Sequence, residues 1–276
     1  YMADTSTTNR ERPDRTPESL VSNRDQPRCI NAQSEDISAV LHQYPNTEFP
    51  HLTRSTIPLL AYWREPGKRI AQVLRQVGLP LSPQGLICFE YPVASAKPRN
   101  KASFTDVMYL SNTVTIAFEG KWTESRYYDV ATWLSKGKLP NRQRVLVHWL
   151  AHIQPYCREA LQADSLGNTV YQMIHRTASA CAAKTKLAGV CYQCFCDKDH
   201  DHQGTLSDIR TWRDVLQPLD SLKFFFQRIE TKRTEFFREL ESRIEGLDAV
   251  RKAEAIRLGL RERELFEFAP EQIIEV

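Results

Sequence analysis

The 276-residue sequence lacks any apolar run that approaches the roughly 20 residues needed to cross a lipid bilayer. Residues 1–20 are polar and lack the apolar core of a secretory signal, so we expect neither a membrane span nor export. No sign of charge dominates, because 37 Lys and Arg residues accompany 34 Asp and Glu residues. This balance permits a nucleic-acid partner but does not demand one.

The number and spacing of the cysteines do not fit the disulfide framework of a small secreted protein. The seven cysteines are odd in number and unevenly spread. Residues 1–35 hold few large apolar side chains and many Ser, Thr, Asn, Arg and Pro residues, which is typical of a flexible tail. We therefore expect a cytoplasmic protein with reduced cysteines and a flexible N-terminal tail.

The rest of the chain carries regular apolar patterns. Short runs of β-forming residues predict strands at 85–93, 103–110, 113–122, 187–196 and 221–230. Helical spacing predicts helices at 34–43, 55–78 with a break near Pro66, 125–137, 141–163, 168–184 and 232–250. These elements indicate the α/β class. We expect a mixed central sheet flanked by helices over residues 36–230, followed by a charged helical extension over residues 231–276.

The extension carries an apolar stripe at helical spacing. Its members are Phe237, Leu240, Ile244 and Leu247. Such a stripe serves either the chain's own core or a contact with another helix. The C-terminal helix is thus expected either to pack on the domain or to bind a second copy of the chain or another protein.

Three charged residues stand beside two otherwise apolar strands, which a Ser-Asn turn joins into a predicted hairpin. Glu119 and Lys121 lie two residues apart on the second strand, so their side chains leave the same face. Asp106 on the first strand falls opposite about residues 117–118, within reach of Glu119.

Clustered carboxylates repel each other, and a divalent cation relieves that repulsion. Hard oxygen ligands suit Mg²⁺ or Mn²⁺, and Mg²⁺ commonly binds a phosphate as well. A lysine on the same face can position a metal-bound water or stabilise charge that develops on a phosphate. The three side chains of Asp106, Glu119 and Lys121 therefore suit the hydrolysis of a phosphodiester.

The order Asp106, twelve residues, then Glu119-Gly120-Lys121 resembles the motif of the PD-(D/E)XK nuclease superfamily, although Thr105 stands where the family usually has proline. The resemblance implies an αβββαβ core and catalytic roles for Asp106, Glu119 and Lys121. It also implies that Mg²⁺ or Mn²⁺ binds to the two carboxylates and the Gly120 carbonyl. The expected activity is metal-dependent hydrolysis of phosphodiester bonds in nucleic acid, with DNA as the expected substrate and defence or restriction as the expected setting.

Other readings of the same residues stay open. The hairpin charges could form a surface ion pair, the fold could bind nucleic acid without cutting it, or Cys and His residues could hold a metal that stabilises an interaction protein. A second Glu-x-Lys triplet, Glu230–Lys232, lacks a hairpin that would bring a carboxylate beside it. We therefore expect no catalytic site at this second triplet, and it can serve as a control for Glu119-Gly120-Lys121.

Basic residues follow the hairpin, with Tyr127, Tyr128 and Trp133 among them. Aromatic side chains in such a stretch can stack on bases. The residues expected to contact nucleic-acid phosphates are Arg126, Lys136, Lys138 and Arg142. The alternative is an amphipathic helix whose charged face is only solvated.

Cys191, Cys194, Cys196 and His200 lie within a short window and are ligand types that zinc uses. Alternation along a strand puts Cys194 and Cys196 on one face and Cys191 on the other. Cysteines in a buried strand are commonly small core residues. We therefore expect these cysteines to pack in the core and not to share a zinc ion.

Overall fold

Eight strands form one mixed sheet in the computed structural model, which describes residues 28–96, 102–269 and 272–276. The strands are β1 (Arg28–Asn31), β2 (Leu86–Val93), β3 (Ser103–Leu110), β4 (Val114–Lys121), β5 (Leu187–Cys196), β6 (Leu222–Arg233), β7 (Phe266–Phe268) and β8 (Gln272–Glu275). The first four pair antiparallel in chain order, whereas β4, β5 and β6 run parallel. β7 and β8 both pair antiparallel with β6.

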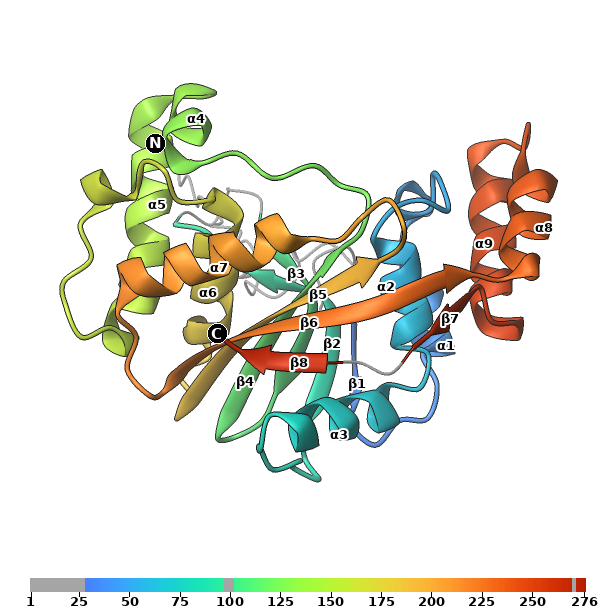
Figure 1. Ribbon diagram of the computed structural model, residues 1–276, viewed down its shortest axis with the longest axis horizontal. Coiled ribbons are helices and arrows are strands. Elements are labelled where there is room, and N and C mark those ends of the chain that lie inside the picture. Colours follow the sequence, from blue (N-terminus) through green and yellow to red (C-terminus); the bar gives the residue numbers. More distant parts are fainter. Residues whose placement is uncertain (1–27, 97–101, 270–271) are drawn as a thin grey trace, which may run out of the picture.

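Helices cover both faces of the sheet, which gives the α/β class that the sequence predicts (Figure 1). One face packs against α1 (Ser38–Leu41), α2 (Thr56–Tyr62), α3 (Pro66–Gln76), α8 (Glu235–Ile244) and α9 (Ala249–Glu262). The other packs against α4 (Val130–Ser135), α5 (Leu139–Ile153), α6 (Tyr171–Ala182) and α7 (Gln203–Leu216). Short 3-10 helices lie at Asn46–Glu48, Gln154–Tyr156 and Ala163–Leu166.

Side chains of the central strands alternate between two hydrophobic clusters, one on each face. On β4, Ile116 and Phe118 lie in the cluster with α2, and Ala117 lies in the cluster with α6. Because both faces are covered, β4 is buried at every position from Val114 to Gly120. The continuous apolar run of this strand reflects that double burial, and a charge placed on it needs a partner.

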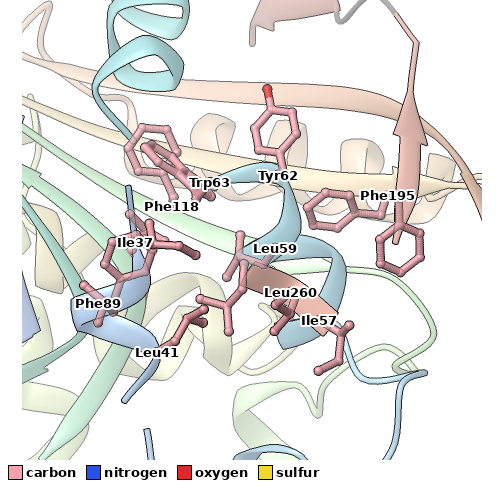
Figure 2. Packing of buried hydrophobic residues seen from close by; sticks show 14 of the residues in the cluster. Ile37, Leu41, Ile57, Leu59, Tyr62, Trp63, Phe89, Phe118, Phe195 and Leu260 are labelled. Atoms are coloured by element: carbon pink, nitrogen blue, oxygen red, sulfur yellow. The ribbon is translucent and has the colours of Figure 1, made fainter. Parts of the chain in front are cut away.

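Helix α2 packs at the centre of the first cluster. Its Leu59 and Ile57 meet Leu260 of α9, and Trp63, directly after the helix, packs edge-on against Phe118 with ring centroids 5.0 Å apart (Figure 2). The predicted break in the helix falls between α2 and α3. Proline begins α3, where its missing N–H leaves no helical hydrogen bond unmade.

A buried chain of hydrogen bonds also ties α2 to the sheet. Trp63 Nε1 donates to Gln193 Oε1 at 2.8 Å, and Gln193 Nε2 donates to Gln227 Oε1 at 2.7 Å. Gln227 Nε2 then donates to the Tyr62 hydroxyl at 2.6 Å. Both glutamines are fully buried, so these bonds satisfy polar atoms that water does not reach. They link the end of α2 to β5 and then to β6.

The N-terminal edge of the sheet differs from the prediction. Arg28–Asn31 lies in the segment expected to be a flexible tail, but it forms β1. Cys29 on this strand lies directly opposite Cys88 on β2, and the two form a disulfide. The prediction of reduced cysteines is therefore wrong for this pair, while the other five cysteines are buried thiols outside this disulfide. Residues 1–27 of the expected tail lie outside the described residues.

The C-terminal extension is helical only in part, because β7 and β8 return to β6. Phe237, Leu240 and Ile244 of its apolar stripe are buried in the first cluster, and Leu247 packs against them. The stripe therefore belongs to the chain's own core, the first of the two alternatives. Within the described residues, none of the helices combines the length and apolarity that a membrane span requires.

We predict that Gln193→Leu destabilises the protein. The change leaves the Trp63 indole N–H buried without its acceptor and removes one donor to Gln227, and each buried polar group left unsatisfied costs about 1–3 kcal/mol. Urea denaturation should show the free energy of unfolding reduced by about 2–4 kcal/mol. The control is Gln76→Leu at the exposed end of α3, which should change it by less than about 0.5 kcal/mol. Equal losses in the two variants would contradict the role of the network.

Candidate functional site

The β3–β4 hairpin brings two carboxylates together at one end of the sheet. Val107 pairs with Phe118, so Asp106 lies opposite Glu119, about one residue from the register predicted by counting from the turn. The Gly120 backbone N–H donates to Asp106 Oδ2 at 2.9 Å. The hairpin therefore presents Asp106 and Glu119 side by side.

Arg176 of α6 lies between these carboxylates. Its Nε donates to Glu119 Oε2, and its Nη2 is 3.4 Å from Asp106 Oδ1. Its Nη1 donates to the backbone carbonyl of Phe104 on β3. Because one guanidinium contacts both carboxylates, the two acidic groups converge on a single cationic centre.

Lys121 and Gln172 complete the cluster on the other side of Glu119. Glu119 Oε1 accepts hydrogen bonds from Lys121 Nζ at 3.0 Å and from Gln172 Nε2. Lys121 Nζ also donates to Gln172 Oε1. Only 4% of the Glu119 side chain and 16% of the Lys121 side chain are exposed. A surface ion pair, one of the alternatives above, does not describe groups this deeply buried.

Burial and charge give the two carboxyl groups different acidities. Burial raises the pKa of Asp106 to about 7, and Glu119 adds to the rise while Arg176 opposes it. Burial also acts against ionised Glu119, but Arg176 and Lys121 outweigh it and lower the pKa of Glu119 to about 2. Glu119 is thus firmly ionised, whereas Asp106 is the group whose ionisation an additional nearby cation would favour.

Glu90 adds a third carboxyl group that the sequence does not point to. It lies on β2 between Phe89 and Tyr91, whose partners on β3 are Val107 and Thr105 on either side of Asp106. Its φ of 49° lies in the left-handed region, which a glutamate in a strand rarely adopts. Burial raises the pKa of Glu90 to about 8, with Asp106 as the next cause. Glu90 therefore lies close enough to Asp106 for the charges of the two carboxyl groups to interact.

Lys121 and Gln172 line a cavity of about 160 Å³ beside this cluster. Its other walls come from the segment after β4, from β5 and from the start of α7, and they include Tyr127, Tyr192 and His202. A larger cavity of about 760 Å³ lies between α2, α3 and residues 260–268, and its lining holds none of the cluster. The smaller cavity therefore gives a ligand access to Lys121 and Gln172 of the cluster.

Of the residues predicted to contact phosphates, Arg126 lines this cavity. Its Nε and Nη2 donate to Asp208 at 2.8 and 3.0 Å. The Lys136 ammonium lies over the Tyr128 ring, 3.2 Å from its centroid. The Arg142 guanidinium lies over the Trp133 ring, 4.9 Å from its centroid. The three that lie in or between α4 and α5, away from the cavity lining, are Lys136, Lys138 and Arg142.

The cysteine-rich strand β5 packs as alternation predicts. Cys191 lies in the first hydrophobic cluster, and Cys194 and Cys196 lie in the second. His200 contacts Asp197 through Nδ1 at 2.8 Å. Within the described ranges, no three side chains of His, Cys, Asp or Glu are arranged to hold a metal ion together. The thiols are thus divided between two faces of the sheet.

Sequence reasoning missed the contributions of α6. Gln172 and Arg176 are four residues apart and share one face of that helix, and both reach Glu119. The available signal was that Arg176 is the only Asp, Glu, Lys or Arg residue between Asp164 and Lys184. Arginine is rarely buried unless a partner neutralises it. That signal indicates a buried acidic partner but does not say which one.

The fold and the site define an α/β protein with a buried cluster of acidic and basic side chains at one end of its sheet. The chain belongs to the family described as a domain of unknown function, DUF6946, which matches residues 32–239. That range includes β2 to β6 and every member of the cluster. No curated protein and no solved structure gives a significant match.

We predict that Arg176→Ala is strongly destabilising. It leaves two buried carboxylates without the charge between them, and breaking a buried ion pair in this way costs about 3–5 kcal/mol. The control is Arg228→Ala, which removes the arginine of the more exposed Arg228–Glu230 pair. That change should cost no more than about 1 kcal/mol. Urea denaturation measures the free energy of unfolding of both variants. Similar decreases in the two would mean that Arg176 does not stabilise the cluster.

Proposed function

We propose that the chain is a metal-dependent nuclease that hydrolyses phosphodiester bonds, with DNA as its substrate. The observation that carries the proposal is the convergence of Asp106, Glu119 and Lys121 at the end of one hairpin, beside a cavity that reaches Lys121. These are the residues on which the resemblance to the PD-(D/E)XK superfamily rests. The order of α3, β2, β3, β4, α6 and β5 follows the αβββαβ core that the resemblance implies, which adds support.

The donor chemistry of the cluster fits Mg²⁺ or Mn²⁺. Asp106 and Glu119 offer carboxylate oxygens, and both already contact one cationic group, the guanidinium of Arg176. Gly120 would offer its backbone carbonyl. Mg²⁺ characteristically uses one or two carboxylates and keeps several waters, so the small number of side-chain ligands suits it. A cation at this position would compete with Arg176 for the same oxygens.

The chain's own residues have separate tasks in this proposal. When bound, the metal ion would polarise a phosphoryl oxygen. Lys121 donates hydrogen bonds and positive charge toward a phosphate or an attacking water in the cavity. Gln172 orients Lys121 through its side-chain carbonyl oxygen. Arg126, which also lines the cavity, is placed to contact the phosphate backbone.

The cellular setting rests on analogy of fold and not on particular residues. Defence or restriction would suit a DNA-cleaving enzyme, and a cytoplasmic location would bring it to DNA. The Cys29–Cys88 disulfide is a feature that is rare in cytosolic proteins, and it weighs against that location.

A second candidate is a nucleic-acid-binding module without catalysis. The observation that favours it is the Arg176 guanidinium, which neutralises the carboxylates with no metal ion. In that case the cluster would serve as a buried ionic support for the hairpin. The two candidates agree on nucleic-acid binding and differ on metal-dependent cleavage.

We predict that Lys121→Met abolishes cleavage and spares binding. Methionine keeps the aliphatic stem but removes the charge, and loss of one transition-state donor lowers the rate by about 10²–10³. Cleavage of plasmid and single-stranded DNA in Mg²⁺ measures the rate, and a gel shift in Ca²⁺ measures binding. The matched control is Lys232→Met, from the Glu230–Lys232 triplet on β6, which should cut at the rate of the unaltered protein. Unchanged cleavage by Lys121→Met would exclude a catalytic lysine there.

We predict that Asp106→Asn weakens Mn²⁺ binding at least about tenfold, or about 1.4 kcal/mol, because the site loses one of its two carboxylates. Calorimetric titration of the two proteins measures the change directly. Asp208→Asn alters a carboxylate of the neighbouring cavity instead and should leave Mn²⁺ affinity unchanged. Equal affinity in all three proteins would show that no metal ion binds between the strands.

A further inference from the structure

Two buried polar atoms beside the cluster have no hydrogen-bond partner. They are the Tyr192 hydroxyl and His202 Nε2, and both residues line the 160 Å³ cavity. Tyr192 is only 1% exposed and lies opposite Glu119 in the β4–β5 register. Buried polar groups in folded proteins are almost always paired, so two unpaired ones in a single cavity point to a ligand that pairs with them.

The donor and acceptor roles of these two atoms limit the kinds of ligand that can pair with them. Burial lowers the pKa of His202, while a hydrogen bond from its ring to the Phe195 carbonyl opposes the shift. A neutral imidazole has one donor and one acceptor nitrogen. Because Nε2 has no partner, the ring donates through Nδ1, which leaves Nε2 as an acceptor. The cavity thus offers an imidazole acceptor and a tyrosine hydroxyl that can donate.

The charges around the cavity are already paired. Arg126 is held by Asp208, and Lys121 is held by Glu119. Glu124 accepts hydrogen bonds from the backbone N–H groups of Ser55 and Trp122. A phosphodiester has no O–H group to donate to Nε2, so a phosphate held by Lys121 and Arg126 would leave this acceptor unpaired. A neutral ligand with both donors and acceptors fits this lining better.

The size and the lining of the cavity also favour a small, neutral ligand. A volume of about 160 Å³ is well below the roughly 300 Å³ at which pockets for drug-sized ligands begin, so the cavity suits one ring system and not a whole nucleotide. Val170 and Met173 supply apolar wall. Tyr127 lines the cavity and is 41% exposed, so the cavity opens to the surface beside an aromatic ring.

We infer that this cavity is a subsite for a single unpaired nucleobase next to the scissile phosphate, so that the substrate is single-stranded nucleic acid. The inference deepens the proposed function and rests on it. Base edges carry donors and acceptors together, which the Tyr192 hydroxyl and His202 Nε2 complement. A base paired within a duplex could not enter the cavity, because its edge is already engaged.

The surface at the mouth of the cavity suits the neighbouring bases. Tyr127 lines the cavity and is 41% exposed. Its ring lies 5.7 Å from that of Tyr128, which is 48% exposed and has Lys136 over one face. Tyr127 is also 6.4 Å from Tyr171, which stacks on Trp133. Stacking of unpaired bases on exposed aromatic rings is how single strands are bound without reading sequence. The aromatic surface and the cavity therefore serve the same kind of ligand.

The test compares Tyr192→Phe with Tyr44→Phe. Each change removes an unpartnered buried hydroxyl and keeps the ring, but Tyr44 lies in the hydrophobic cluster on the opposite face of the sheet. Fluorescence anisotropy in Ca²⁺ measures binding of a labelled single strand and of its duplex. Tyr192→Phe should weaken single-strand binding about tenfold, as for loss of one hydrogen bond, and leave duplex binding unchanged. Tyr44→Phe should match the unaltered protein in both.

His202→Asn is the second variant, because asparagine tolerates the left-handed backbone of His202, whose φ is 58°. It should also weaken single-strand binding selectively. If neither cavity variant differs from Tyr44→Phe, the subsite is refuted. If single-strand binding depends on Tyr192 while Mg²⁺ produces no cleavage, the subsite stands and the nuclease proposal fails. Cleavage of single strand and duplex at equal rates in every variant would overturn the subsite and keep the nuclease.

Discussion

The site depends on one ionic contact, the guanidinium of Arg176 between Glu119 and Asp106. Without it, two carboxylates would stand side by side on a strand pair with both faces covered, where desolvation of each ion costs several kcal/mol. The same side chain also binds the backbone of β3 at Phe104. Arg176 thus fixes α6 against the hairpin, and because Gln172 is on the same helix face, it fixes the position of Lys121 as well.

Lys121 connects two unlike environments. On one side is the ionic cluster, where every charge is paired and burial gives the carboxyl groups different pKa values. On the other is a small cavity whose charged groups are paired, while the Tyr192 hydroxyl and His202 Nε2 have no hydrogen-bond partner. Lys121 lines the cavity and donates to Glu119, so it contacts both the cavity and the cluster. This arrangement separates the part of the site that would do chemistry from the part that would select the ligand.

The elements of the fold were predictable where the signal is local. The hairpin of β3 and β4 follows from two runs of β-forming residues around a Ser-Asn turn. The division of the β5 cysteines between two faces, and the face shared by Glu119 and Lys121, follow from the alternation of side chains along a strand. Contacts that join distant segments were not predictable. Nothing near Arg176 in the sequence indicates that its partners lie 57 and 70 residues away. The pairing of β1 with β2 likewise depends on a segment whose composition resembles a tail.

The margins of the sheet have a consequence for behaviour in solution. At one margin stands β1, a four-residue strand that a disulfide fastens to its neighbour. At the other, the long strand β6 is covered along different stretches by the short strands β7 and β8. Long, bare edge strands invite pairing between molecules and aggregation, and short edges discourage it. In the part of the chain that the structure describes, the longest strands therefore have partners within the same molecule, which favours colloidal stability at high protein concentration.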